Sequence, residues 1–432
     1  MGAADPPQER LPELSSLLQG LQAPGSLALL AWGPALLAAV AAAGLLVLIA
    51  ALVRLFARAP RLNGCEAAAA QPLPDTALTV VVPAYNEAAN IAACLTSLLS
   101  SEEPCPDWRV LLVDDRSTDA TVAIAREAAR SCAAPAGRFA VLDAGARPAG
   151  EHWVGKNWAC SRAMEQVSSD WVLFVDADVR LQPATLRRAL TQATVEGADL
   201  LSLAPRLSCG CLAEWMVQPI IASLLGLGFP IEAANDPTSP VAFAAGPFML
   251  FRRSAYAAVG GHRALAGEVV EDLALARRIK GGGFRLRYLL GLDAAELRMY
   301  ADFAALWEGW TKNWLLGLDG DVPRALAAAA VVVLLFAGPW LLLPAAAIAA
   351  AMLPPQHRWP LLAAGAMALL GIALQLALRL WTRRQFALPL RHWWLMGAGG
   401  LVVGAIGPAS VWRTLTGRGW TWKGRPLTRD AG

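Results

Sequence analysis

WVLFVDADV, residues 171–179, joins five large apolar side chains directly to two carboxylates, Asp176 and Asp178. An apolar run of this kind is typical of a strand that is buried on both faces of a parallel sheet. Aspartate is rarely buried without a partner, so we expect the two acids just beyond the end of the strand. The stretch therefore predicts an α/β sheet that delivers acidic side chains to one edge.

Three other apolar runs, at residues 79–82, 110–113 and 139–142, have the length and composition of buried strands. Helix-like segments at 87–100 and 120–130 lie between them, and this alternation predicts a mixed, mostly parallel sheet with helices on both faces. Parallel strands end at one edge, where open α/β sheets bind ligands. The polar residues expected to converge at that edge are Pro83, Tyr85, Glu87, Asp114, Asp115, Asp143, Asp176 and Asp178.

Carboxylates gathered in one crevice repel one another unless a cation or hydrogen-bond donors offset their charge. A divalent cation is the simplest compensation, and Mg²⁺ or Mn²⁺ takes oxygen ligands while leaving positions open for phosphate. We expect Asp178 to be the direct ligand, with Asp176 beside it. The alternative is that both acids only form a turn or cap a helix, which is the usual role of aspartate after a strand.

A second acidic cluster, which includes Glu271 and Asp272, stands directly before a helix-like run at 273–280. Asp272 is the candidate general base for an acceptor hydroxyl, a role that contributes about a hundred- to ten-thousandfold in rate. In the alternative interpretation, both acids merely complement the dipole of the helix.

Two further positions are candidates for contacts with a nucleotide sugar. Lys156, on an expected loop between the third and fourth strands, would reach a phosphate or would simply be solvated. Gly246 opens another strand-like run and would let a sugar approach the backbone closely, or would form a plain turn.

The composition, 56% hydrophobic and 16% charged, is too apolar for an ordinary soluble enzyme and too charged for a pure membrane bundle. Residues 27–53 carry no charged side chain and exceed the roughly 20 residues that a helix needs to cross a bilayer. Further apolar runs occupy 325–353, 361–381 and 393–412, the last of them rich in glycine. The sequence predicts a soluble domain at about 76–300 attached to several membrane helices.

Arginines follow the first and third apolar runs, so the positive-inside rule puts the soluble domain in the cytoplasm of a bacterial-type inner membrane. Four crossings would then put the C-terminal tail outside the cell, although the same rule favours the cytoplasmic side for its basic residues. One segment is therefore expected to be re-entrant or not to cross. The basic residues of the tail are Arg413, Arg418, Lys423, Arg425 and Arg429.

Trp307, Trp310 and Trp314 recur at helical spacing, so three indoles share one face of a helix. Tryptophan favours the headgroup level of a bilayer, which predicts an interfacial helix. Lys312 on the same helix would touch a diphosphate or reach a lipid phosphate. The net charge of +3 is small and its basic excess flanks the apolar runs, so we expect a membrane partner and no nucleic acid.

The sequence resembles the inverting family-2 glycosyltransferases with a GT-A (Rossmann-like) domain over about residues 76–300. Five stretches carry the resemblance, in this order: VVVPAYNEAANI, VLLVDDRSTDAT, FVDAD, AAGPFMLFRRSAY and VVEDLALARRIKGGGF. More narrowly, GKNWA, RMY, WEGWTKNW and WTWKGRP are similar to membrane glycosyltransferases associated with hopanoid and carotenoid pathways.

The resemblance implies a nucleoside diphosphate sugar as donor, with a UDP-sugar expected, a lipid acceptor of terpenoid type, and Mg²⁺ or Mn²⁺ as cofactor. The Q-x-x-R-W motif of processive synthases is not found, and WTKNW stands at about its place, so we expect transfer of a single sugar. The resemblance implies that this transfer inverts the anomeric configuration. By position, the resemblance assigns the nucleotide to Pro83, Tyr85, Glu87 and Asp115, joined by Asp114, the diphosphate and cation to Asp176 and Asp178, and the base to Asp272.

Two other functions stay open at this point. One is a processive polysaccharide synthase of the same family, and the other is a transporter whose soluble domain only senses nucleotide. The expected segments are an N-terminal segment at 1–26, a transmembrane helix at 27–56, a cytoplasmic GT-A domain at 76–300, an interfacial helix region at 301–322, two or three spans within 325–412, and a basic tail at 413–432.

Overall fold

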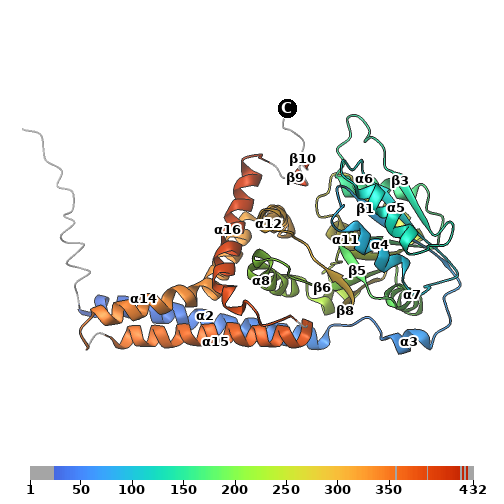
Figure 1. Cartoon of the computed structure of the whole chain (residues 1–432). Coiled ribbons are helices and arrows are strands. Elements are labelled where there is room, and N and C mark those ends of the chain that lie inside the picture. The colour runs from blue at the N-terminus through green and yellow to red at the C-terminus, as the bar shows by residue number, and fades with distance from the viewer. Residues whose placement is uncertain (1–23, 356–357, 387, 419–420, 423–424, 427–432) are drawn as a thin grey trace, which may run out of the picture.

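The computed structural model describes the whole chain except residues 1–23, 356–357, 387, 419–420, 423–424 and 427–432. The N-terminal segment expected at 1–26 therefore lies almost entirely outside the described residues, as does much of the tail expected at 413–432. An α/β domain lies at one end of the molecule, and a bundle of long helices extends away from it (Figure 1).

The domain is built on one sheet with the strand order β3-β2-β1-β4-β7-β6-β8-β5. β1 pairs in parallel with β2 and β4, and β2 pairs in parallel with β3. These four strands coincide with the four apolar runs, so that prediction is confirmed, and their carboxyl ends share one edge. The strands are β1 (Ala77–Ala84), β2 (Asp107–Asp114), β3 (Phe139–Asp143), β4 (Trp171–Val175), β5 (Val179–Leu181), β6 (Leu200–Leu207), β7 (Phe248–Arg252) and β8 (Leu286–Leu297).

The remaining strands curl the sheet. β7 runs antiparallel to both β4 and β6, and β5 runs antiparallel to β8. Only Asp176, Ala177 and Asp178 separate the end of β4 from the start of β5, yet β5 lies at the far edge of the strand order. The sheet must therefore curl until that edge returns to the end of β4. The two acids are fixed where these parts of the sheet meet.

Helices cover both faces of the sheet, as the alternation of strands and helices predicts. Successive strand residues point to opposite faces. Val80 packs in a core with α4, α5 and α7, whereas its neighbour Val81 packs in a second core with α6 and α11. The helices are α4 (Ile91–Leu99), α5 (Thr121–Ser131), α6 (Gly155–Met164), α7 (Thr185–Val195) and α11 (Glu271–Gly281).

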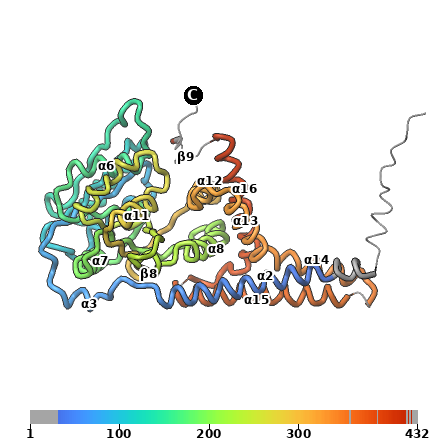
Figure 2. Tube along the Cα trace, turned by 180° about the vertical axis from the view of Figure 1, so that it is seen from behind, coloured from blue at the N-terminus to red at the C-terminus, as the bar shows by residue number. Residues whose placement is uncertain are grey.

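Within the described part of the chain, four helices are long and apolar enough to cross a membrane. Three helices, α2, α14 and α15, pack side by side and form the long bundle seen in Figures 1 and 2. A fourth, α16, crosses this bundle at a steep angle and packs on α13 (Figure 1). The π-helical turn η2 separates α13 from α14. Their bounds are α2 (Pro24–Arg58), α13 (Val322–Val332), η2 (Val333–Ala337), α14 (Gly338–Met352), α15 (Trp359–Phe386) and α16 (Met396–Leu415).

Glycines allow α16 to approach its neighbours closely. A Cβ atom at Gly399 would lie 2.1 Å from the carbonyl oxygen of Met216 in α8 (Leu212–Gly228). One at Gly400 would lie 2.7 Å from Cβ of Phe336. Small residues let helix backbones pack at such short range. The glycine content that weakens the apolar signal of this run is thus a requirement of its packing.

The tryptophans of α12 (Phe303–Gly317) do not form an exposed face. Trp310 and Trp314 are only 7% and 9% exposed, in a core that they share with α8 and α16. Trp310 donates its indole N–H to Gln218 at 2.9 Å, and Trp314 donates its own to the carbonyl of Ala325 at 3.1 Å. The prediction that this face meets lipid is wrong for these two indoles, because other helices cover them and accept their N–H groups.

Candidate active site

A cavity of about 600 Å³, the acidic crevice, lies where the parallel strands end. Asp115 and Asp178 line it, as the strand-end argument predicts, and Asp272 from the start of a helix lines it as well. Their chemical roles stay predictions. The candidate residues that line the crevice are Pro83, Glu87, Asp115, Lys156, Asp176, Asp178, Gly246, Glu271, Asp272 and Lys312.

Four assigned site residues lie outside this lining, as does Asp143, which accepts the backbone N–H of Gly145 at 2.8 Å. Asp114 accepts the backbone N–H of Ser117 at 3.1 Å and so closes the turn after β2. Trp310 lines a neighbouring cavity, and Trp314 is buried among the helices. The fourth residue, Tyr85, is only 7% exposed.

Lys156 offsets the charge of two carboxylates. Its ammonium lies 2.7 Å from Oδ1 of Asp176 and 2.7 Å from Oε1 of Glu271. Burial by itself would lower the pKa of Lys156, but the two carboxylates raise it well above its ordinary value, so the lysine stays charged. The residue stands in the first turn of α6, which begins at Gly155, and not on a loop as expected. The chain itself therefore supplies part of the compensation that the sequence assigns to a metal ion.

Asp178 is the carboxylate that best fits a cation. Its Oδ1 atom is buried and has no hydrogen-bond partner in the described part of the chain. Burial, together with the charges of Asp176 and Glu87, raises the pKa of Asp178 to about 8. Among the described residues, no group of three or more His, Cys, Asp or Glu side chains is placed to hold a metal ion. A cation at Asp178 would therefore need further oxygen ligands, such as those of a phosphate.

Asp272 is held by the backbone in the first turn of α11. Its Oδ2 atom accepts the N–H of Gly246 at 3.0 Å, and its Oδ1 atom accepts the N–H of Leu273 at 2.7 Å. Burial and the neighbouring charge of Glu271 raise the pKa of Asp272 to about 6. The carboxylate is therefore ionised at neutral pH, yet it is a stronger base than an ordinary aspartate.

Lys312 comes from α12 and brings positive charge to the same crevice. Burial lowers the pKa of its ammonium, although the charges of Glu271 and Asp272 act in the opposite direction. A desolvated ammonium of this kind is stabilised by any further anion that binds beside it.

Two arginines that the motif analysis does not assign to the site contact Asp115. Nη2 of Arg147, from the loop after β3, lies 2.8 Å from Oδ2 of Asp115, and Nη1 of Arg425 lies 2.7 Å from the same oxygen. The guanidinium of Arg425 also lies 3.4 Å from the centroid of the Tyr85 ring. Arg425 belongs to the WTWKGRP stretch, so the sequence held a signal for it. Nothing in the sequence singles out Arg147.

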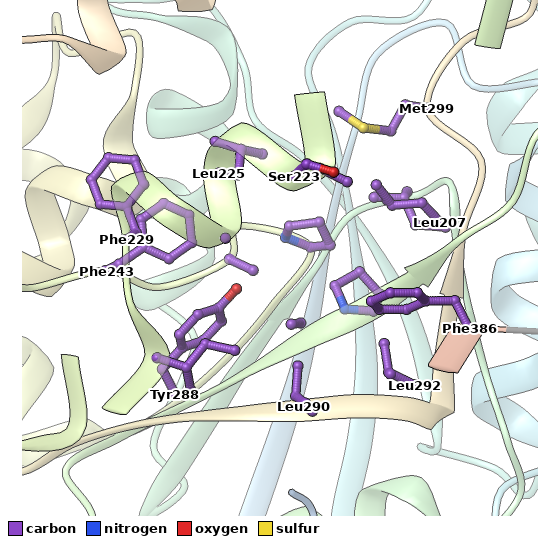
Figure 3. Close-up of a pocket in the computed structure, with 18 of the residues that line it drawn as sticks. Leu207, Ser223, Leu225, Phe229, Phe243, Tyr288, Leu290, Leu292, Met299 and Phe386 are labelled. Atoms are coloured by element: carbon purple, nitrogen blue, oxygen red, sulfur yellow. The ribbon is translucent and has the colours of Figure 1, made fainter. Parts of the chain in front are cut away.

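A second cavity, the apolar cavity, has a volume of about 310 Å³ and adjoins the acidic crevice. Figure 3 shows aromatic and aliphatic side chains around it, among them Phe229, Phe243 and Leu290. Asp272 and Gly246 line both cavities, so Asp272 stands where the two meet. The long bundle contributes Leu52, Phe56, Trp381 and Phe386 to the lining.

Comparison with known proteins gives a family match over part of the α/β domain. Residues 79–260 match the family described as Glycosyl transferase family 2. The 4,4'-diaponeurosporenoate glycosyltransferases of Staphylococcus aureus strains MRSA252 and USA300 are each 28% identical to this chain over 260 residues. The alignments cover 58% of this chain and 64% of those relatives, so the chain spans less than two thirds of their length.

Two solved structures are similar to this chain at low sequence identity. The mannosyltransferase PcManGT from Pyrobaculum calidifontis, in complex with GDP-Man and Mn²⁺, is 18% identical with a TM-score of 0.45, over 88% of this chain and 99% of that chain. Residues 1–349 of TarS from S. aureus, in complex with UDP-GlcNAc, are 15% identical with a TM-score of 0.37, over 80% of this chain and 93% of that chain.

Proposed function

This chain carries a glycosyl transferase family 2 domain, and from that premise we propose that the protein is a membrane enzyme that transfers one sugar from a nucleoside diphosphate sugar to a lipid hydroxyl. The observation that carries the proposal is that Asp272 lines both the acidic crevice and the apolar cavity. The crevice suits a charged donor and the cavity suits an apolar acceptor. A base at Asp272 would therefore meet both substrates.

The acidic crevice and the residues beside it have groups for each part of the donor. Tyr85 is not part of the crevice lining, but its ring and the carboxylate of Asp115 contact the same guanidinium, that of Arg425. The ring would offer a stacking surface for a nucleobase, and the carboxylate an acceptor for a base N–H. The ammonium of Lys312 is stabilised by the diphosphate, because burial has already removed much of its water. A UDP-sugar is the donor to test first.

Asp176 and Asp178 would hold Mg²⁺ or Mn²⁺ together with diphosphate oxygens. The support for this site is the buried Oδ1 atom of Asp178, which has no partner among the residues that the structure describes. When bound, such a cation supplies positive charge that stabilises the departing nucleoside diphosphate. Lys156 orients Asp176 by a direct ion pair, so that this carboxylate does not have to turn before the donor binds.

Asp272 is proposed as the general base. It takes the proton of the acceptor hydroxyl while the acceptor oxygen forms a bond to the anomeric carbon of the sugar. The bond between that carbon and the diphosphate oxygen breaks, and the electron pair leaves with the nucleoside diphosphate. A single displacement of this kind inverts the configuration at the anomeric carbon. The pKa of about 6 keeps Asp272 ionised at neutral pH.

The acceptor is proposed to lie in the apolar cavity with its polar end toward Asp272. Phe56 of α2 and Trp381 of α15 line the cavity, so it adjoins the helices that are apolar enough to cross a membrane. The S. aureus relatives are named for 4,4'-diaponeurosporenoate, which supports a carotenoid-like lipid as acceptor. An alcohol acceptor would give a glycoside, whereas a carboxylic acid would give a glycosyl ester.

We also propose that α2, the continuous span that ends in α14 (Val322–Met352) and α15 cross the membrane while α16 lies along its surface. Figure 1 shows α16 across the bundle near the end of α14, with α2 and α15 continuing past it toward the α/β domain. The contact between Arg425 and Asp115 requires the tail and the domain to share one side of the membrane. Two crossings between them, by α14 and α15, meet that requirement. The positive-inside rule makes this side the cytoplasm of a bacterial-type inner membrane.

The test uses the purified full chain in detergent with Mg²⁺ or Mn²⁺, a panel of nucleoside diphosphate sugars and a bacterial lipid extract. Mass spectrometry should find one added sugar on a lipid, and mild alkali should leave the product intact because it is a glycoside. Release of the sugar by alkali would instead identify an ester. Long polymer formed before the donor is exhausted would indicate a polysaccharide synthase, and sugar flux into liposomes without transfer would indicate a transporter.

A further inference from the structure

The C-terminal part of the chain returns to the acidic crevice. β9 (Thr421–Trp422) and β10 (Arg425–Pro426) pair in antiparallel fashion, and Figure 1 shows them near α12 beside the α/β domain. Thr421 lines the acidic crevice and bonds to Glu308 of α12. The tail is therefore connected to the site on two sides, through Thr421 and through Arg425.

Arg425 makes a dense set of contacts at the end of β2. Nη1 lies 2.7 Å from Oδ2 of Asp115 and also donates to the carbonyl of Asp115 at 2.9 Å. Nη2 donates to the carbonyl of Arg116 at 3.2 Å. The central carbon of the guanidinium lies over the ring of Tyr85, 3.4 Å from the ring centroid. A planar cation that stacks on a ring and donates in its own plane is well suited to arginine and not to lysine.

These contacts are the ones that a nucleobase would need. A base is also planar, stacks on an aromatic ring and presents in-plane N–H groups to a carboxylate. At 3.4 Å from the centroid, the guanidinium leaves no room for a base on the same face of Tyr85. Only one of the two groups can occupy this position at a time.

We propose that Arg425 occupies the nucleobase position of the donor site when no donor is bound, so that the C-terminal segment and the nucleotide compete for Tyr85 and Asp115. The inference rests on the proposed function, because it takes these two residues as the contacts of the donor base. It adds a regulatory property: the apparent affinity for the donor depends on how often Arg425 is undocked.

Asp115 has a second cationic partner that remains when Arg425 leaves. Arg147 contacts the same oxygen, Oδ2, at 2.8 Å, so the carboxylate keeps one cation when Arg425 leaves. The side chain of Arg425 is 27% exposed, whereas that of Asp115 is only 4% exposed. The tail arginine is thus the more accessible partner. Its departure does not leave the buried carboxylate of Asp115 without a cation.

The size of the effect follows from the population of the undocked state. When a site is competent in only one molecule out of ten, the apparent dissociation constant is about tenfold higher than the intrinsic one. Arg425→Ala should remove the competing group and tighten nucleotide binding by roughly that factor. Arg425→Lys keeps the charge but loses the flat stacking group, so it should tighten binding as well, although less.

The experiment is isothermal titration of the full chain in detergent, in the presence of Mn²⁺, with UDP, GDP, ADP and CDP. Arg418→Ala is the matched control, because Arg418 is also a tail-proximal arginine on an aromatic ring but stacks on Trp412, 4.4 Å from its centroid, and not in the crevice. The expected result is that Arg425→Ala binds the preferred nucleotide about tenfold more tightly than both wild type and Arg418→Ala.

The other outcomes overturn the inference in distinguishable ways. Equal or weaker binding by Arg425→Ala, with clear binding by wild type, would show that Arg425 is inert or assists the donor, and the proposed function would stand. Absence of nucleotide binding by every protein would overturn the proposed function and this inference together. An equal increase of nucleotide affinity in Arg418→Ala would show that the effect comes from general loss of positive charge and not from the stacked position of Arg425.

Discussion

The backbone N–H of Gly246 donates a hydrogen bond to Oδ2 of Asp272 at 3.0 Å, and it does so at the junction of the acidic crevice and the apolar cavity. A Cβ atom at position 246 would lie 2.9 Å from that oxygen and 3.3 Å from Cβ of Asp272. The position of the proposed base therefore depends on the absence of a side chain at residue 246.

Gly246→Ala should displace the Asp272 carboxylate and lower kcat. A misplacement of about 1 Å costs roughly a hundredfold in rate. Steady-state transfer assays would measure the loss, while nucleotide titration should show a nearly unchanged donor affinity. Gly281→Ala is the control, because a Cβ there would meet no atom within 4 Å. An unchanged kcat in Gly246→Ala would mean that Asp272 is not positioned by this contact.

The pH dependence of the reaction should report Asp272. Its pKa is raised to about 6, so the carboxylate is protonated and inactive as a base at lower pH. We expect kcat/KM to rise about tenfold per pH unit up to pH ~6 and then to level off. The measurement is a pH profile of kcat/KM between pH 5 and 8. If kcat/KM instead stays constant down to the ordinary pKa of an aspartate, Asp272 is not the base.

The four parallel strands and their acids could be predicted from sequence because each signal is local. A buried strand reads as a short apolar run, and the polar residues that follow it, such as Asp115 or Asp178, reach the shared edge by the geometry of a parallel sheet. The helix that begins at Glu271 is equally local. Each of these predictions is confirmed by the structure as a placement in the fold.

Other features depend on contacts between distant segments, which a single sequence does not encode as a pattern. Arg425 reaches Asp115 across 310 positions. The spacing of Trp310 and Trp314 predicts a shared face correctly, but whether that face meets lipid or another helix depends on α8 and α16. The length and apolarity of α16 resemble those of a span, and only its packing reveals that it runs across the bundle.

Lys156→Met should weaken both the fold and the site. The substitution leaves Asp176 and Glu271 without the ammonium that now lies 2.7 Å from each of them. Breaking a largely buried ion pair costs about 3–5 kcal/mol. Thermal unfolding in detergent should show a lower Tm, and the added substitution Glu271→Gln should restore part of it because one unpaired charge is gone. Equal Tm values for all three proteins would contradict this role.

Filling the apolar cavity should block the acceptor and spare the donor. Ser223 of α8 lines this cavity, as Figure 3 shows, and its hydroxyl donates to the carbonyl of Pro219 in its own helix, at 2.8 Å. Ser223→Phe should lower transfer to lipid by roughly tenfold or more, since a clash of about 1.4 kcal/mol already has that effect.

The same preparation of Ser223→Phe should bind nucleotide like wild type. Ser223→Ala is the control, because it removes the hydroxyl without adding volume. Full transfer activity in Ser223→Phe would mean that the acceptor does not use this cavity, and a parallel loss of nucleotide binding would mean that the substitution damages the domain as a whole.

Asp272 is the proposed base at the junction between a donor site and a lipid site. Wild type and Asp272→Asn are compared in one preparation each. Titration measures nucleotide affinity, and mass spectrometry quantifies the glycosylated lipid. Asp272→Asn should bind nucleotide within about threefold of wild type but lose product by roughly a hundred- to ten-thousandfold. Product formation by Asp272→Asn at the wild-type rate would contradict this role.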